Sequence, residues 1–367
     1  MTAVHDQKLT RLDEFMVERG LTELWFLRPA NFAWLTGGGD STVDRAADVG
    51  VAALGYDGDA VRALTSNNEA DRFCAEELPS AVPVETFDWY ESSLEEAVAR
   101  ASTDRAGADV PTVPGLDLVD ASRLRLPFTE PDRRVLERAG RATADAVETV
   151  ARDVSPDDTE YAAAGRLRDE LWRRGLESPV VLVGGAERSQ RHRHFTPTDE
   201  PLGEYALLTV VAVERGVNIA VTRTVDFDAP SWLRERHDDA SHVAVTAIAA
   251  TREAATTGGG TAADVFAEIR RAYAAVGWED EWRRHHQGGA IGFESREWTA
   301  TPSADAPVEA PAPYAWNPTV RGAKAEDTVL VSSDGVDVVT DTGSWPTAAY
   351  EAVDSDLRID LPVPLSR

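Results

Sequence analysis

The stretch YALLTVVAVERGVNIAVTRTV, residues 205–225, gives the clearest indication of the fold. Its two halves, 205–214 and 217–225, are rich in valine, leucine and other strand-forming residues, and a short turn sequence separates them. Such apolar runs are typical of buried β-strands. A further strand is expected upstream at 179–184, so this part of the chain is predicted to form a sheet.

Helical patterns flank this sheet on both sides. A long helix is expected near Pro131, which suits a first helical turn, and a second helix covers about 158–174. A later helix is expected to begin at Thr261, where Asp264 completes a variant of the capping box. Strands return at 312–341. The second half of the chain is therefore predicted to mix helices and strands.

The first half of the chain has a smaller pattern. Short apolar runs, two of them at 49–56 and 60–66, alternate with helix-like segments, which is typical of a small α/β domain. Residues 103–131 are rich in Asp, Pro, Thr and Gly and have no sustained period, so a linker is expected there. We predict two domains, 1–126 and 127–367.

The charge of the chain excludes several classes of partner. Its 367 residues include 37 Lys and Arg against 64 Asp and Glu, which gives a formal net charge of −27. This charge would repel nucleic acids and anionic membrane surfaces. Lys8 and Lys324 are the only lysines, which leaves 35 arginines. An acidic, lysine-poor composition resembles that of proteins from salt-loving archaea, because high salt screens the self-repulsion of such a surface.

Nothing in the sequence indicates export or a membrane anchor. The first residues lack an apolar signal core, and no run of about 18 apolar residues occurs. Cys74 is the only cysteine, so neither an intramolecular disulfide nor a cysteine-based metal site is expected. We therefore expect a cytoplasmic protein.

Four of the seven histidines form two close pairs, His192 with His194 and His285 with His286. Alternate residues of an extended segment share one face, so His192 and His194 are expected to lie together. Flanking arginines disfavour a metal ion there, which favours an acid/base histidine. Two surface histidines in a loop are equally compatible with the spacing.

The order of motifs resembles the pita-bread family, which includes methionine aminopeptidase, Xaa-Pro aminopeptidase, prolidase and creatinase. The segment PANFAWLTG at 29–37 is similar to part of the creatinase-type N-terminal domain. The landmarks of the second half are HFTP at 194–197, VTRT at 221–224, GGAIG at 288–292, NP at 317–318 and EDTVLV at 326–331. The resemblance implies an α+β fold, with a pita-bread C-terminal domain preceded by a smaller α/β creatinase-type N-terminal domain.

The same resemblance implies that the metal site of the family is lost. The metallopeptidases hold two metal ions with two Asp, one His and two Glu side chains. The corresponding positions here are Thr209, Ala220, Gly289, Asn317 and Glu326. Hard divalent ions need several carboxylates, and only Glu326 supplies one. We therefore expect no metal and no other cofactor.

The resemblance also implies which residues form the site. His194 matches the family histidine beside the reacting group, and Glu326 is retained, so both are predicted to be catalytic. Substrate contacts are predicted for Gln287, Glu297, Asn317, Arg223 and Arg296. Creatinase is the precedent, because it hydrolyses a C–N bond on this fold without a metal.

Three functions remain open. The first is a metal-independent hydrolase of a small C–N-bond compound or short peptide, with His194 as acid/base. The second is a non-catalytic pita-bread module that binds a peptide or metabolite. The third is an Xaa-Pro aminopeptidase or dipeptidase with an unusual metal site, which the lost ligands disfavour. Family members often pair, so a homodimer is expected.

Overall fold

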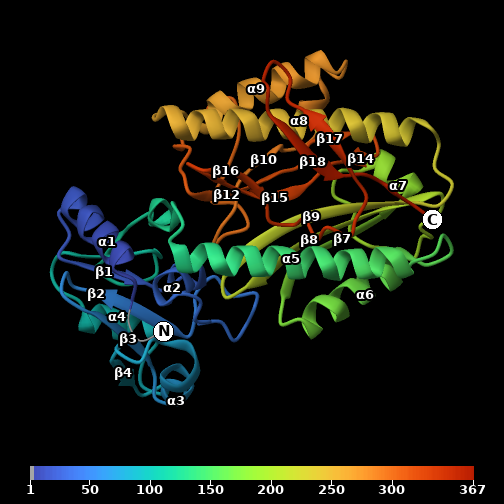
Figure 1. Ribbon diagram of the computed structural model, residues 1–367. Helices are drawn as coiled ribbons and strands as arrows, with labels where there is room; N and C mark the ends of the chain where they lie inside the picture. Colours follow the sequence, from blue (N-terminus) through green and yellow to red (C-terminus); the bar gives the residue numbers. More distant parts are fainter. Residues whose placement is uncertain (1–3) are drawn as a thin grey trace. The chain divides into compact units, whose positions relative to one another are not determined.

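The computed structural model describes residues 4–367 and consists of two compact units (Figure 1). They divide between Asp132 and Arg133, near the start of helix α5 (Glu130–Asp153). Part of the expected linker forms β-strand instead of an irregular segment. In this part, Gly107 packs closely against Val119. A Cβ on Gly107 would lie 2.8 Å from the Val119 Cγ1 atom.

The first unit is built on a six-stranded mixed sheet of order β4-β3-β2-β1-β5-β6. The strands are β1 (Glu23–Phe26), β2 (Ala52–Tyr56), β3 (Val61–Ser66), β4 (Val84–Phe87), β5 (Ala106–Ala108) and β6 (Asp117–Leu118). The α-helices are α1 (Asp6–Arg19), α2 (Pro29–Thr36), α3 (Ala70–Arg72) and α4 (Leu94–Ala101). Trp25 of β1 and Val98 of α4 belong to one buried cluster. The strands predicted at 49–56 and 60–66 are confirmed as β2 and β3.

The second unit contains a four-stranded sheet of order β19-β9-β8-β7 and a five-stranded sheet of order β11-β10-β12-β15-β16. Their strands are β7 (Glu177–Gly185), β8 (Tyr205–Glu214), β9 (Val217–Asp226), β10 (Gly288–Ala290), β11 (Trp298–Thr299), β12 (Ala312–Trp316), β15 (Asp327–Ser332), β16 (Gly335–Val338) and β19 (Leu365–Ser366). Two short ribbons pair β13 (Thr319–Val320) with β14 (Ala323–Lys324), and β17 (Thr347–Glu351) with β18 (Arg358–Pro362). The helices of this unit are α5, α6 (Glu160–Arg173), α7 (Ala186–Arg191), α8 (Trp232–Thr257) and α9 (Ala262–Ala275).

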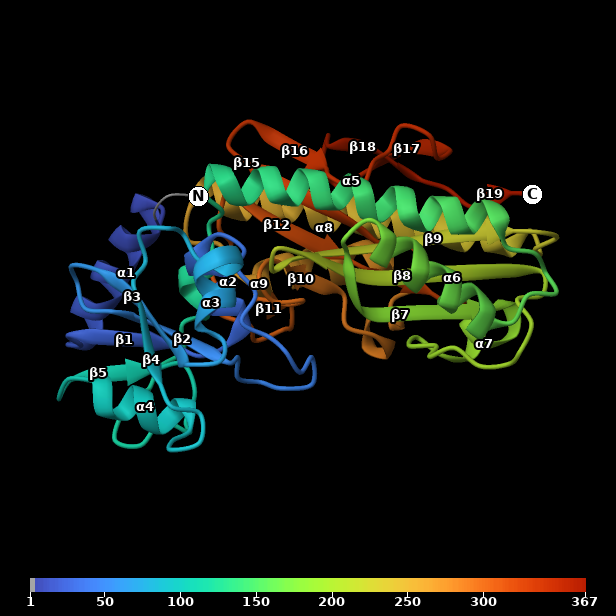
Figure 2. The same ribbon diagram turned by 90° about the horizontal axis from the view of Figure 1, so that it is seen from below.

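Helices cover both sides of the strands in this second unit. Helices α5 and α6 lie on one side, and α8 and α9 lie on the other (Figure 1). Figure 2 shows β7, β8 and β9 side by side. The strands predicted at 205–214 and 217–225 are confirmed, as is the helix capped by Thr261 and Asp264. Within residues 4–367, no helix is both long and apolar enough to cross a membrane.

The two sheets of the second unit meet where β9 lies against the start of β15. The Thr222 amide donates to the Glu326 carbonyl over 3.0 Å, and the Ala220 amide donates to Thr328 Oγ1 over 3.0 Å. Successive side chains of a strand point to opposite faces. Thr222 and Arg223 are therefore directed to opposite sides, and so are Glu326 and Asp327.

Candidate active site

On one face of this junction, three buried polar side chains form a chain of hydrogen bonds. Thr209 Oγ1 lies 2.7 Å from Thr222 Oγ1, and Thr222 Oγ1 donates to Glu326 Oε2 over 2.7 Å. A hydroxyl has one proton to donate. Because Thr222 gives its proton to Glu326, Thr209 must donate to Thr222. The chain therefore ends on the Glu326 carboxylate.

A buried lysine is paired with the same carboxylate. Lys324 Nζ lies 2.7 Å from Glu326 Oε2, and the two side chains are 4% and 3% exposed. The Arg296 guanidinium lies 3.6 Å from the other oxygen, Oε1. Burial raises the pKa of Glu326, but the charges of Lys324 and Arg296 and the hydrogen bonds outweigh it and hold that pKa below its usual range. Glu326 is therefore an anion between two cations.

Sequence reasoning missed Lys324, although two signals pointed to it. It is one of two lysines in a chain that otherwise uses arginine, and the other, Lys8, is also buried and lies 2.7 Å from Asp132. It also stands two residues before Glu326, and the extended-chain period of two directs such residues to one face. Lysine carries a compact point charge, whereas arginine carries a broad planar group. A narrow buried position beside Glu326 suits the ammonium.

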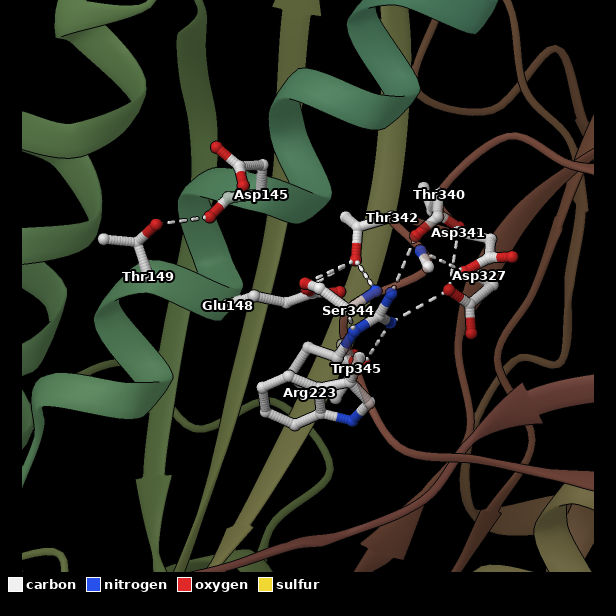
Figure 3. Close-up of polar contacts among 12 residues, drawn as sticks. Asp145, Glu148, Thr149, Arg223, Asp327, Thr340, Asp341, Thr342, Ser344 and Trp345 are labelled. Atoms are coloured by element: carbon white, nitrogen blue, oxygen red, sulfur yellow. Dashed lines mark hydrogen bonds and ion pairs between the residues drawn. The ribbon is translucent and has the colours of Figure 1, made fainter.

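Arg223 belongs to the opposite face and not to this site. Its side chain is fully buried, and all three nitrogens donate to neighbours (Figure 3). Its carboxylate partners are Glu148 at 3.3 Å and Asp327 at 2.9 Å, and its NH2 group donates to the Thr340 carbonyl over 2.8 Å. We expected Arg223 to contact substrate; in the structure it instead ties α5 to β9 and β15.

The remaining positions that correspond to family metal ligands offer little to a metal ion. Ala220 packs in an apolar cluster with Ile291 and Ala315. Gly289 has no room for a side chain, because a Cβ there would lie 2.1 Å from the Trp298 carbonyl oxygen. Asn317 is 2% exposed, and its Oδ1 has no hydrogen-bond partner within residues 4–367.

These residues do not fit a two-metal centre. The set supplies one carboxylate, Glu326, and Lys324 already neutralises it at 2.7 Å. Two divalent ions would need several anionic oxygen ligands in place of the hydroxyl, methyl and amide groups found here. A lysine beside them would add repulsion.

Three histidines gather near Lys324 and Glu326. The ring centroids are 5.0 Å apart for His194 and His285, 5.6 Å for His194 and His286, and 4.3 Å for His285 and His286. Burial and the Lys324 charge lower the pKa of His194, while Glu326 opposes them. Burial and the same lysine lower the pKa of His285 strongly, and burial with Arg296 lowers that of His286 to about 4. All three rings are therefore neutral at neutral pH.

Two other residues singled out in the sequence, His192 and Gln287, make contacts of a different kind. His192 is exposed, and its backbone amide donates to the Arg188 carbonyl at the end of α7 over 2.9 Å. Gln287 braces the backbone, because its amide accepts from the Tyr273 hydroxyl over 2.7 Å and donates to the carbonyls of Trp282 and His285.

Two further predicted contacts, Glu297 and Arg296, lie on one loop. Glu297 accepts from the Glu294 amide over 3.1 Å, which closes this loop. Arg296 remains beside Glu326, and within residues 4–367 its buried Nε atom has no hydrogen-bond partner.

A cavity of about 580 Å³ lies beside His194. It is lined by Gln190, Arg191, His192, Arg193, His194, Arg284 and Arg321. Three of these arginines surround buried Glu281. Arg193 is ion-paired with it, and Arg284 and Arg321 lie 3.8 and 3.9 Å from its Oε2 atom. In so acidic a chain, this group concentrates positive charge next to the histidines, which suits a carboxylate-bearing ligand.

Comparisons with known proteins agree with this fold. Residues 134–333 match the metallopeptidase family M24. The Xaa-Pro dipeptidase of Pyrococcus horikoshii is 22% identical over 228 residues, which are 60% of this chain and 64% of that protein. The chain thus matches less than two thirds of the length of this relative.

Solved structures extend the likeness to most of the chain. The prolidase from Pyrococcus horikoshii superposes with a TM-score of 0.75 at 16% identity and covers 92% of this chain and 98% of its own. The N-terminal domain of the FACT complex subunit SPT16 from chickpea superposes with a TM-score of 0.69 at 13% identity, over 93% of this chain and 98% of its own. These likenesses confirm the predicted α+β pita-bread fold.

Proposed function

The chain belongs to metallopeptidase family M24, and we propose that it is a hydrolase of small C–N-bond substrates that works without the two-metal centre of its family. The observation that carries this proposal is the ion pair of Lys324 with Glu326, 2.7 Å apart and buried. The family resemblance equates Glu326 with a metal ligand. A fixed ammonium there supplies the positive charge that metal ions supply in the relatives.

His194 is the acid/base in this proposal. Without a metal to acidify the attacking water, a side-chain base must take its proton, and a neutral imidazole can do so near pH 7. The water oxygen then forms a bond to the carbonyl carbon. His194 returns the proton to the nitrogen of the leaving group as the C–N bond breaks. Its ring is neutral because burial and Lys324 lower its pKa.

Lys324 and Arg296 stabilise the charge that develops during this attack. When the tetrahedral intermediate forms, the carbonyl oxygen becomes an anion, and preorganised cations in a dry site stabilise it. Glu326 acts as a positioning residue, since it holds Lys324 through Oε2 and lies 3.6 Å from Arg296 through Oε1. The arginines beside His194 favour a substrate with a free carboxylate, such as an N-acyl amino acid, a ureido acid or a short peptide.

The second candidate is a binding module with no catalysis. It draws support from the likeness to the N-terminal domain of a FACT complex subunit, whose name does not describe a peptidase. In this alternative the cavity beside His194 binds a peptide or metabolite, and His194 only contacts this ligand. An Xaa-Pro dipeptidase with an unusual metal site finds less support. Such a site would need the Glu326 carboxylate, which is already ion-paired with Lys324.

Turnover assays separate these candidates. Chelator-treated protein at high salt is incubated with ureido, guanidino and N-acyl compounds, and with Xaa-Pro dipeptides as the competing panel. We expect turnover of a compound from the first panel, and replacement His194→Ala should lower kcat by about 10²- to 10⁴-fold. His242→Ala is the matched control, because this histidine packs against Tyr350 and belongs neither to the histidine cluster nor to the residues that line the cavity.

Three results would contradict parts of this proposal. Full turnover by the His194→Ala protein would remove the acid/base role. Cleavage of Xaa-Pro dipeptides only after addition of Mn²⁺ or Co²⁺ would favour the metallopeptidase instead. If no compound from either panel turns over, the binding module becomes the better reading.

A further inference from the structure

The three histidines near Lys324 have the arrangement of a ligand set. One nitrogen from each of His194, His285 and His286 can be chosen so that all three lie within 4.8 Å of one another. They come from two separate segments, the one after α7 and the one before β10, which the fold brings together. Neither the −27 charge of the chain nor the family resemblance predicts this cluster.

His285 supplies an independent sign that a ligand is missing. Its side chain is 9% exposed, and neither Nδ1 nor Nε2 has a hydrogen-bond partner within residues 4–367. Buried polar groups in folded proteins are almost always satisfied by protein, water or a ligand. An imidazole with both nitrogens unpaired, stacked on His286 and close to His194, is therefore free to bind a partner that residues 4–367 do not supply.

We propose that His194, His285 and His286 bind one transition-metal ion of the Zn²⁺, Cu²⁺ or Ni²⁺ type. Neutral imidazoles suit these ions, whereas Mg²⁺, Ca²⁺ and Mn²⁺ prefer carboxylate oxygen. Zinc–nitrogen bonds of about 2.0–2.1 Å in a tetrahedral site place the nitrogens about 3.4 Å apart. Nitrogens that lie up to 4.8 Å apart must therefore approach one another by about 1.4 Å. The side chains of His194 and His286 reach the protein surface although neighbouring atoms cover part of each ring, so these rings can turn toward the more deeply buried His285.

The charges around the cluster set the strength of binding. Lys324, Arg296 and Arg193 are positive, while Glu326 and Glu281 are negative and paired with them. The excess positive charge opposes a divalent ion. Lys324→Met removes one of these positive charges, and it should therefore lower the Kd for the metal ion. We expect a decrease of about tenfold, because the lysine charge is partly compensated by Glu326.

Occupancy of this site has a consequence that rests on the proposed function. A metal ion takes up the lone pair of His194, so this ring can no longer accept a proton from water. Zn²⁺ should then inhibit turnover in proportion to its binding, and removal of the ion by a chelator should restore turnover. The ion is an inhibitor in this scheme and not a cofactor.

Isothermal titration of chelator-treated protein with ZnCl₂ tests the binding without any substrate. We expect one ion per chain, and a loss of affinity of at least about 100-fold in His194→Ala, His285→Ala and His286→Ala. His192→Ala should bind as the unchanged protein does. Circular dichroism of each metal-free variant checks that it is folded, and Co²⁺ bound to the unchanged protein should give the visible absorption of a tetrahedral site. MnCl₂ and MgCl₂ should give no binding.

Several outcomes would overturn the site. They are the absence of Zn²⁺ binding, equal binding by folded His285→Ala protein, or binding of Mn²⁺ as tight as that of Zn²⁺. If His285 had only a structural role, His285→Ala would lower the free energy of unfolding. The unchanged protein with Co²⁺ would then show no absorption of a tetrahedral site. Failure of the proposed function is separable, because a protein that binds Zn²⁺ through the three histidines but has no turnover keeps the site and loses the hydrolase.

Discussion

Two ion-pair networks lie on opposite faces of the same strands, β9 and the start of β15, and they differ in how fully they are paired. On one face Arg223 joins Glu148 and Asp327, with side chains between 0% and 8% exposed. On the other face Lys324 joins Glu326, which Arg296 approaches at 3.6 Å. Adjacent residues, Thr222 with Arg223 and Glu326 with Asp327, supply both networks.

The Arg223 network is saturated. Glu148 also accepts from Thr342 over 2.7 Å, and Asp327 also accepts from Thr340 over 2.7 Å (Figure 3). Each charged group has several protein partners, which is how buried charges are accommodated in a stable core.

The Lys324 network is open by comparison. Within residues 4–367, Glu326 is the one acidic partner of Lys324, while Arg296 Nε and both nitrogens of His285 have no hydrogen-bond partner. Unpaired polar atoms at a buried place are costly and persist where a ligand completes them. The comparison teaches that pairing, more than burial, distinguishes the structural face from the face that carries the candidate site.

The largest effect should follow from breaking the saturated network. Arg223→Ala leaves Glu148 and Asp327 buried without their shared cation, so we expect the free energy of unfolding to fall by about 3–5 kcal/mol. Urea titration at constant high salt measures this free energy of unfolding. Arg138→Ala is the control, because its pair with Glu214 is exposed and should be worth at most about 1 kcal/mol. Equal losses for both variants would contradict the structural role of Arg223.

Breaking the open network of Lys324 should lower the free energy of unfolding by a smaller amount. Lys324→Met removes one cation, but Glu326 keeps Arg296 nearby and the hydrogen bond from Thr222. We expect a loss of about 1–3 kcal/mol in the free energy of unfolding, the usual cost of an incompletely satisfied buried group. The same urea titration measures it, with Arg223→Ala as the reference. A loss as large as that of Arg223→Ala would mean that Lys324 is a core residue, and its proposed role in catalysis would lose support.

Much of the fold could be predicted from local pattern. The runs that became β8 and β9 are rich in apolar residues without strict alternation, as is typical of fully buried strands, and the Thr261 cap of α9 has the expected capping box. Strand β10, in contrast, has the sequence Gly-Gly-Ala, which carries no strand preference. Its pairing with β11 and β12 is decided by tertiary contacts, since a Cβ on Gly288 would lie 2.1 Å from the Ala315 carbonyl oxygen.

The candidate site could be predicted only in part. The family resemblance predicted catalytic roles for His194 and Glu326, which stay predictions, but it could not point to Lys324, which is not among the family landmarks. The alternation of side chains along an extended segment predicts that Arg223 points away from Thr222. It also predicts that Lys324 and Glu326 lie on the same face. The grouping of His194 with His285 could not be predicted, because segments far apart in the sequence meet only in the folded chain.

The smallest expected effect, that of Thr209→Val, comes from a comparison of one hydroxyl on each face. Thr340→Val removes a donor to the Asp327 carboxylate, so we expect a loss of about 1.5–3 kcal/mol in the free energy of unfolding, as for hydrogen bonds to charged groups. Thr209→Val removes a donor to the neutral Thr222 oxygen, while Thr222 still donates to Glu326, so we expect about 0.5–1.5 kcal/mol.

Both threonines are buried and lose the same hydroxyl, so the difference between the two variants isolates the charge of the acceptor. Urea titration of the two proteins side by side, at one salt concentration, measures this difference. If Thr209→Val were the more damaging change, the hydroxyl chain to Glu326 would be a main support of the sheet. The division between a structural face and an open face would then fail.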